Sequence, residues 1–186
     1  MEINLSWDLF IIVFFLVIIA YSFVIGKNQT MKVILSSYVA ILAADGTGNL
    51  VQKYLLGNDP VINIFRIQAE NSSFIIMKIA IFVILTVLLT VRGAFEINLF
   101  EERSRFMGVV LNAAYGVLSA GLIISTILVY ISGISIFSAV YVGGDNPITQ
   151  IASDSSLVRT MIENYSIWFS FPAVIFMISS LFGTKE

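Results

Sequence analysis

The stretch that decides the fold is FIIMKIAIFVILTVLLTV, Phe74–Val91, in which Lys78 is the only charged residue. A helix rises about 1.5 Å per residue, so this run covers most of a bilayer core of about 30 Å. The chain is therefore predicted to fold in lipid. Lys78 lies one turn inside the run. Its long side chain can either reach back to the interface or face a polar path between helices.

The composition of the whole chain agrees with a membrane protein. Hydrophobic residues make up 58% of the 186 residues, charged residues 12%, and the mean hydropathy is +0.95. A soluble domain of this length needs more polar surface. The chain has no cysteine and no histidine, which removes disulfides, thiol nucleophiles, the usual zinc ligands and histidine acid–base chemistry. We therefore expect no enzyme, no cofactor and no metal. The net charge of −2 includes no basic stripe, which predicts no nucleic-acid partner.

The apolar runs predict one all-α membrane domain over residues 1–186. The expected transmembrane helices cover about residues 9–26, 31–44, 74–91 and 108–131. The run 31–44 is short, so it either borrows length from residues 50–56 or crosses a locally thinned bilayer. The glycine-rich segment Asp45–Asn49 that follows is expected to be a turn that ends this helix.

Two further segments allow more than one interpretation. Residues 157–182 are either a fifth span or an interfacial helix, because aromatic residues and Pro172 suit both. In residues 92–107, apolar residues recur at near-helical spacing among charges. This pattern predicts an amphipathic helix in the headgroups between the third and fourth spans, with a solvated charged loop as the alternative.

The orientation follows from the basic residues. Lys27 and Lys32 lie in the first short connection, and Arg92, Arg103 and Arg105 lie in the connection before the fourth span. Basic residues concentrate in cytoplasmic loops. Both connections are therefore expected inside, and the N-terminus outside.

Small residues at four-residue spacing form two ridges. One, on the fourth expected helix, is Gly108, Asn112, Gly116 and Ala120; the other, on the second, is Ser36, Ala40 and Ala44. In lipid, helices associate where small residues let backbones approach and where polar side chains bond across. We expect the first ridge to pack on the second, either within one molecule or as a seam between copies. Asn112 is the side chain with the greatest need of a partner at depth.

Taken together, these features resemble the colicin V production (CvpA) family of small bacterial inner-membrane proteins. Asp8 leads the first span as an aspartate does in the family, and Gly26 matches its helix-ending glycine. The segment Arg105–Gly108, continued through Gly116, is similar to the Arg-x-x-Gly start of the family's glycine-rich fourth helix. The departures from the pattern are Ser104, Asn112 and Tyr115. Ser104 stands where the family has an acidic residue, Tyr115 where it usually has a basic one, and Asn112 where it repeats glycine. The first two remove charges from this region, and the packing role of the small ridge remains.

The resemblance implies a multi-pass protein of the bacterial cytoplasmic membrane with a non-enzymatic accessory or scaffold role in secretion or envelope homeostasis. Its partners would be the lipid bilayer and either further copies of the chain or other membrane proteins. The alternative function is a small channel or transporter with a path near Lys78 and Asn112. An intramembrane enzyme is the poorest hypothesis, since no serine has a base beside it in a recognisable motif. Lys78, Asp8 and Arg105 are the candidate functional polar residues.

Overall fold

The computed structural model describes residues 6–55, 71–93, 97, 105–132 and 155–181. The regular elements within these ranges are all helices: α1 (Trp7–Leu55), α2 (Asn71–Arg92), α3 (Arg105–Ile131), α5 (Ser156–Glu163) and α6 (Tyr165–Leu181). Three of these helices are long and apolar enough to cross a membrane, and the bent pair α5–α6 makes a fourth if it is counted as one span. The described part of the chain is therefore an all-helical, multi-pass membrane protein, as the apolar runs predict.

Helix α1 is bent at Gly26, whose φ of 78° and ψ of 169° interrupt the helical geometry. This backbone region is essentially restricted to glycine. We call residues 7–25 the first arm of α1 and residues 27–55 the second arm. The second arm continues to Leu55, so the prediction that Asp45–Asn49 forms a helix-ending turn is wrong. The segment stays helical although each interior glycine costs about 1 kcal/mol relative to alanine.

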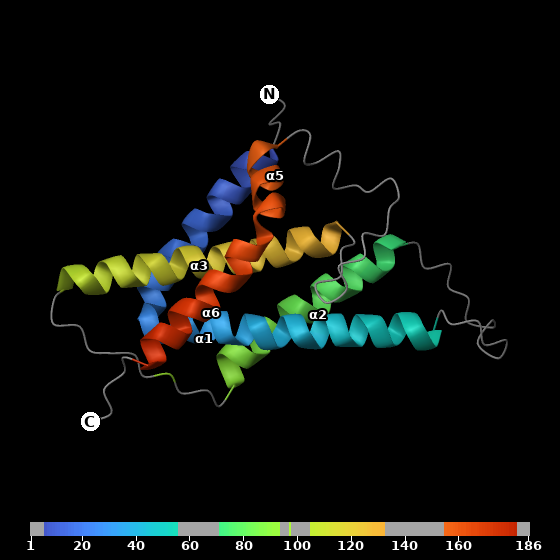
Figure 1. Ribbon diagram of the computed structural model, residues 1–186, viewed down its shortest axis with the longest axis horizontal. Helices are drawn as coiled ribbons and strands as arrows, with labels where there is room; N and C mark the ends of the chain where they lie inside the picture. The colour runs from blue at the N-terminus through green and yellow to red at the C-terminus, as the bar shows by residue number, and fades with distance from the viewer. Residues whose placement is uncertain (1–5, 56–70, 94–96, 98–104, 133–154, 182–186) are drawn as a thin grey trace.

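Helix α3 lies at the centre of the bundle. In its most apolar stretch of 18 residues, 67% of the residues are buried. The corresponding figure is 11% for both α1 and α2. It crosses the first arm of α1 and runs beside the second arm, while α2 packs mainly on α1 and α6 on α3 (Figure 1). Because both arms of α1 contact α3, the Gly26 bend determines how the bundle is assembled.

The bend of α1, its C-terminal end and the ends of α2 and α3 fall into two groups. In Figure 1 the Gly26 bend, the end of α2 and the start of α3 lie toward the left and lower left. The end of α1, the start of α2 and the end of α3 lie toward the right. Lys27, Arg92 and the start of α3 at Arg105 thus share one end of the bundle, which is the grouping that the positive-inside argument requires.

Two apolar clusters hold the helices together. The larger joins the second arm of α1 with α2 and α3, and its buried members are Met31, Ile34, Ala40, Ile41, Ala44, Phe82, Tyr115, Leu118, Leu122 and Tyr130. The smaller joins the first arm with α3 and α5, and its buried members are Ile11, Ile124, Leu128, Val158 and Met161. Helix α3 contributes to both clusters, which explains why so much of it is buried.

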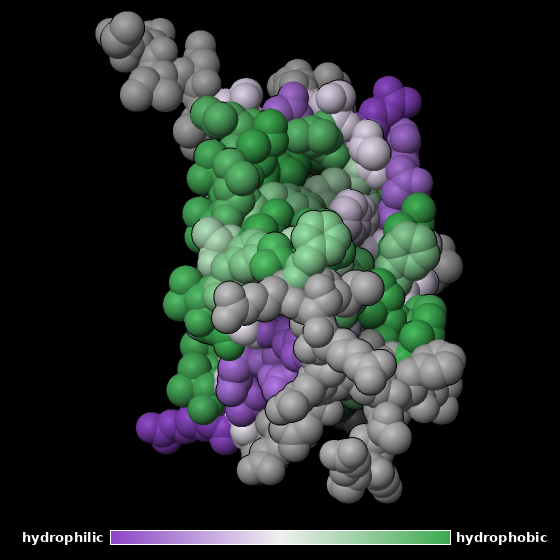
Figure 2. All heavy atoms as spheres, turned by 90° about the vertical axis from the view of Figure 1, so that its left-hand side faces the viewer, coloured by the Kyte–Doolittle hydropathy of each residue, from purple (hydrophilic) through white to green (hydrophobic). Residues whose placement is uncertain are grey.

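The outer surface of the bundle is apolar. Leu16, Val24, Val87 and Val91 are among its exposed residues, with 82% of Val24 accessible. Figure 2, which views the molecule from the left-hand side of Figure 1, shows green hydrophobic residues over much of this face, with purple hydrophilic residues at its upper right edge and in its lower part. Exposed apolar side chains in this number are expected of helices that face lipid.

The last two helices make an angle of 61° with each other. The break falls at Asn164, whose φ of −108° and ψ of 23° are not helical. Helix α5 buries Val158 and Met161 and exposes Arg159 and Glu163, which form an ion pair. Residues 157–182 are therefore not one straight helix. Of the amphipathic helix predicted within residues 92–107, residues 94–96 and 98–104 lie outside the described residues.

Candidate functional site

Lys78 forms an ion pair with a buried carboxylate on α1. Its Nζ lies 2.9 Å from Oδ1 of Asp45, and the two side chains are 16% and 0% exposed, respectively. The same Nζ donates to Oδ1 of Asn49, one helical turn beyond Asp45, over 3.3 Å. Both interpretations of Lys78, the reach to the interface and the polar path between helices, stay predictions, and the structure adds the partners of its ammonium. The ammonium turns toward the neighbouring helix.

The glycine-rich segment of α1 is shaped around this lysine. A Cβ added at Gly48 would overlap Cε of Lys78 and would lie 2.9 Å from its Cγ. On another side, Nζ lies 6.0 Å from the centroid of the Tyr130 ring on α3. The missing side chain at Gly48 thus admits the lysine stem, while Asp45 and Asn49 bind its ammonium. Ionisable residues within membrane-spanning helices usually pair with one another and are candidates for a functional site.

A second polar cluster lies at the bend of α1. Ser22 Oγ donates to the backbone carbonyl of Asn112 over 2.9 Å, and Asn112 Nδ2 donates to the carbonyl of Ser22 over 3.0 Å. Thr30 Oγ1 donates to the carbonyl of Gly26 over 2.9 Å and also contacts Ser22 Oγ at 3.0 Å. Asn112 therefore has the partner it was predicted to need. These bonds hold the two arms of α1 and helix α3 together.

The small-residue ridge of α3 packs on a different part of α1 from the one predicted. A Cβ at Gly116 would lie 3.0 Å from Cβ of Ser22 and 3.2 Å from Cα of Ile19. The partner of Gly116 and Asn112 is thus the first arm of α1, and the expected pairing with Ser36, Ala40 and Ala44 is wrong for these residues. The Gly26 bend brings the first arm across α3, where Ser22 supplies hydrogen bonds.

The other ridge residues are also inside the bundle. Ser36, Ala40, Ala44 and Ala120 are each 0% exposed. Ala40 and Ala44 belong to the cluster that includes Phe82 and Tyr130. Gly108, near the start of α3, is only half-buried. Both ridges are therefore used largely for packing within one molecule.

Asp8 joins the first helix to the last part of the chain. Its Oδ1 accepts the hydroxyl proton of Ser155 and, over 3.1 Å, the backbone N–H of Leu157. Ser155 is the N-cap of α5, because its Oγ accepts from the N–H of Val158 over 3.1 Å. A carboxylate suits this position, since the N-terminal N–H groups of a helix lack partners and attract negative charge. Asp8 thus has a structural role at one end of the bundle.

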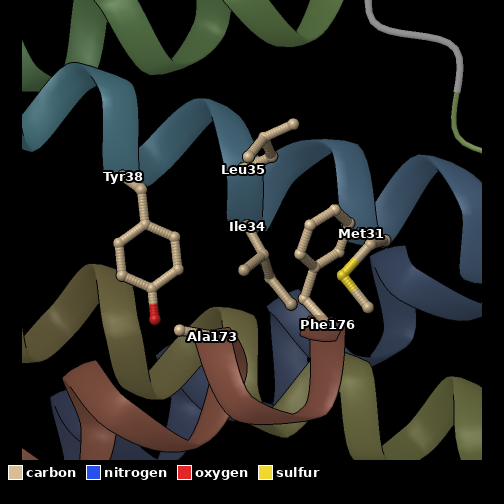
Figure 3. A pocket seen from close by; sticks show the side chains of 6 residues that line it. All are labelled: Met31, Ile34, Leu35, Tyr38, Ala173 and Phe176. Carbon is tan, nitrogen blue, oxygen red and sulfur yellow. The ribbon is translucent and has the colours of Figure 1, made fainter. Parts of the chain in front are cut away.

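A small apolar pocket separates the second arm of α1 from α6 (Figure 3). Its volume is about 210 Å³, and its lining residues are Met31, Ile34, Leu35, Tyr38, Ala173 and Phe176. The hydroxyl of Tyr38 donates to the carbonyl of Phe169 over 2.5 Å. Tyr38 is therefore tied to α6.

The structure separates the polar residues that a path near Lys78 and Asn112 would need to combine. Lys78 approaches α3 at Tyr130, whereas Asn112 lies five turns earlier on the same helix, about 27 Å away at 1.5 Å per residue. The two residues thus lie at opposite ends of α3. Arg105 begins α3, and its side chain is not among those that the structure describes. The described residues contain no group of three or more acidic side chains that could hold a metal ion.

Sequence reasoning missed Asp45 as the partner of Lys78. It treated Asp45 as part of a turn outside the spans, although an acidic residue and an amide at i and i+4 flank Gly48 on one helical face. The sequence did contain a signal: the i, i+4 spacing of Asp45 and Asn49, together with Lys78 as the only charge of the next span.

Comparison with known proteins finds no matching family model, no matching curated protein and no matching solved structure. The class of the chain, a multi-pass helical membrane protein, therefore rests on its own helices. The similarity to the CvpA family stays a prediction from the residues that carry it.

Proposed function

We propose that the chain is a CvpA-like, non-enzymatic protein of the bacterial cytoplasmic membrane with an accessory or scaffold role in secretion or envelope homeostasis. One observation carries this proposal: the residues on which the resemblance rests are joints of the fold. Asp8 caps α5, Gly26 makes the bend of α1, and Gly116 admits the first arm against α3. A resemblance at such joints supports a shared architecture.

The surface available for a partner follows from the packing. The ridge of Asn112 and Gly116 is covered by Ser22 and Ile19 of the same molecule. Association with another protein or a further copy would therefore use the outer, lipid-facing surfaces. The proposed orientation places the N-terminus outside and the Gly26 bend in the cytoplasm, because Lys27, Arg92 and Arg105 lie at one end.

Complementation tests the accessory role. The chain is expressed in a bacterial strain that lacks its CvpA family member, and growth in detergent and export of colicin V are measured. We expect the parent chain to restore growth and export partly or fully. Gly26→Ala should be less abundant in the membrane and should fail to restore them. Leu16→Ala, at a lipid-facing position, is the matched control and should rescue like the parent. Failure of the parent chain at normal membrane abundance would contradict the proposal.

A conduit is the second candidate function, and the buried Asp45–Lys78 pair is the observation that favours it. Intramembrane charges often line transport paths. Asn112 is not part of this candidate, because its amide bonds Ser22 near the opposite end of the bundle.

A further inference from the structure

The pocket between the second arm of α1 and α6 has a buried floor and an exposed rim. Met31 and Ile34 form the floor and are each only 1% exposed. On the rim, Tyr38 and Phe176 are half-buried and Ala173 is exposed. In Figure 3 Tyr38 lies on one side of the pocket and Phe176 on the other, with Ile34 between them. The pocket thus reaches the outer surface of the bundle at Ala173.

The side chains that line the pocket offer no free hydrogen-bond donor. Five of the six lining residues have wholly apolar side chains. The sixth, Tyr38, donates its hydroxyl proton to the carbonyl of Phe169 over 2.5 Å. Such a pocket does not hold water well, because a bound water needs roughly two to four polar partners. Its occupant is therefore expected to be apolar.

The pocket is large enough for part of a hydrocarbon chain. Its volume is about 210 Å³, and an apolar cavity of about 150 Å³ in another protein binds benzene. The residues of α1 that line it run from Met31 to Tyr38, a length of about 10 Å at a helical rise of roughly 1.5 Å per residue. An apolar space of this length and volume suits a segment of a linear chain.

The residues beside the mouth of the pocket face lipid. Val174 and Met177 follow Ala173 on α6, and both are exposed. Val39 follows Tyr38 on α1 and is also exposed. Exposed apolar side chains of a membrane-embedded bundle contact the acyl chains of the bilayer. The hydrocarbon that can reach the pocket from outside is therefore an acyl chain.

The pocket begins near the basic end of the bundle. Met31 lies one turn after Lys27, and the lining residues continue from there toward the middle of the second arm. Lys27 and Arg92 share this end of the bundle (Figure 1). Basic residues at a membrane surface attract anionic head groups. A lipid whose acyl chain lies in the pocket would therefore have its phosphate at the level of these basic residues.

We propose that the pocket between the second arm of α1 and α6 binds one acyl chain of a membrane phospholipid, with the phosphate at the end of the bundle that carries Lys27 and Arg92. The bound chain fills the space between the two helices and so stabilises α6 against the second arm. This lipid site goes beyond the accessory function. It is tested on the purified protein, so its failure is distinguishable from a failure of complementation.

Photo-cross-linking tests the lipid site directly. The parent chain is reconstituted in nanodiscs that contain phosphatidylglycerol with a diazirine in its acyl chain. After irradiation, the modified residues are identified by peptide mass spectrometry. We expect adducts on Met31 and Ile34, which lipid at the outer surface does not reach. Adducts confined to exposed residues such as Leu16 and Val24 would overturn the site.

A substitution at the rim tests whether these adducts come from the pocket. Ala173→Phe places a ring in the mouth of the pocket from an exposed position, and it should lower the yield of adducts on Met31 and Ile34 several-fold. Val174→Phe adds the same ring at the next position, which is exposed and does not line the pocket. This matched control should keep the yield near that of the parent. An unchanged yield in Ala173→Phe, with the circular dichroism of the parent, would overturn the site.

A measurement on the parent chain needs no substitution. A ligand that binds only the folded protein raises the midpoint of thermal unfolding. We expect phosphatidylglycerol added to the protein in detergent to raise this midpoint, and glycerol 3-phosphate, which has no acyl chain, to leave it unchanged. No rise with the lipid, or an equal rise with glycerol 3-phosphate, would contradict a site for an acyl chain.

Discussion

Lys78→Met removes the charge of the buried ion pair and keeps an apolar side chain of similar length over Gly48. Asp45, which is 0% exposed, then loses its cationic partner at a distance of 2.9 Å. Breaking a buried pair by removing one partner costs about 3–5 kcal/mol, because the other charge stays buried. The exposed part of Lys78 is small, so solvent screens little of its interaction with Asp45. We expect the free energy of unfolding to fall by about 3 kcal/mol.

The assay is reversible unfolding of the purified protein in mixed micelles, followed by circular dichroism. A double-mutant cycle with Asp45→Asn isolates the pair, because the doubly substituted protein has no buried charge left at the site. We expect the double variant to be more stable than Lys78→Met alone. Lys32→Met, a half-buried lysine of the same bundle, is the control and should change stability by less than about 1 kcal/mol. Equal stability of Lys78→Met and the parent would refute the reasoning.

Three other substitutions test the joints of the fold in the same unfolding assay. Gly26→Ala should cost about 1–3 kcal/mol, because φ of 78° with ψ of 169° strains a residue with a side chain; a stability equal to the parent's would contradict the bend. Gly116→Leu should cost about 1–3 kcal/mol through overpacking against Ile19 and Ser22. The lipid-facing control Leu16→Ala should cost less, and equal losses in the two variants would contradict the close contact at Gly116. Asp8→Ala should cost about 0.5–2 kcal/mol, as for other lost caps, and should increase hydrogen exchange in the first turn of α5; unchanged exchange there would exclude the cap.

The apolar runs were enough to predict the class of the fold, because lipid requires every backbone group of a span to bond within its own helix. They were not enough to predict that the second arm of α1 continues to Leu55. Glycine and aspartate in Asp45–Asn49 favour a turn locally. The contact of Gly48 with the Lys78 stem and the ion pair of Asp45 are tertiary interactions that a local pattern does not contain.

The small-residue spacing correctly indicated that Asn112 and Gly116 need a close neighbour. It did not identify that neighbour, because α1 carries small residues at two places. One includes Ser22, and the other begins at Ser36. The choice depends on the angle of the Gly26 bend, which is set by a left-handed φ that the sequence only permits. Asp8 was singled out by resemblance alone, and its role as a cap depends on Ser155, far along the chain.

The central claim is that the second arm of α1 crosses the membrane as one helix, from the Gly26 bend through the Asp45–Asn49 segment. Labelling of single cysteines in intact cells with a membrane-impermeant thiol reagent tests it most directly. Gln29, beside the bend, and Asn49, near the other end of the second arm, are both exposed. The account predicts that Asn49→Cys is labelled in intact cells and that Gln29→Cys is labelled only after the cells are opened. Labelling of both cysteines from the same side of the membrane would contradict it.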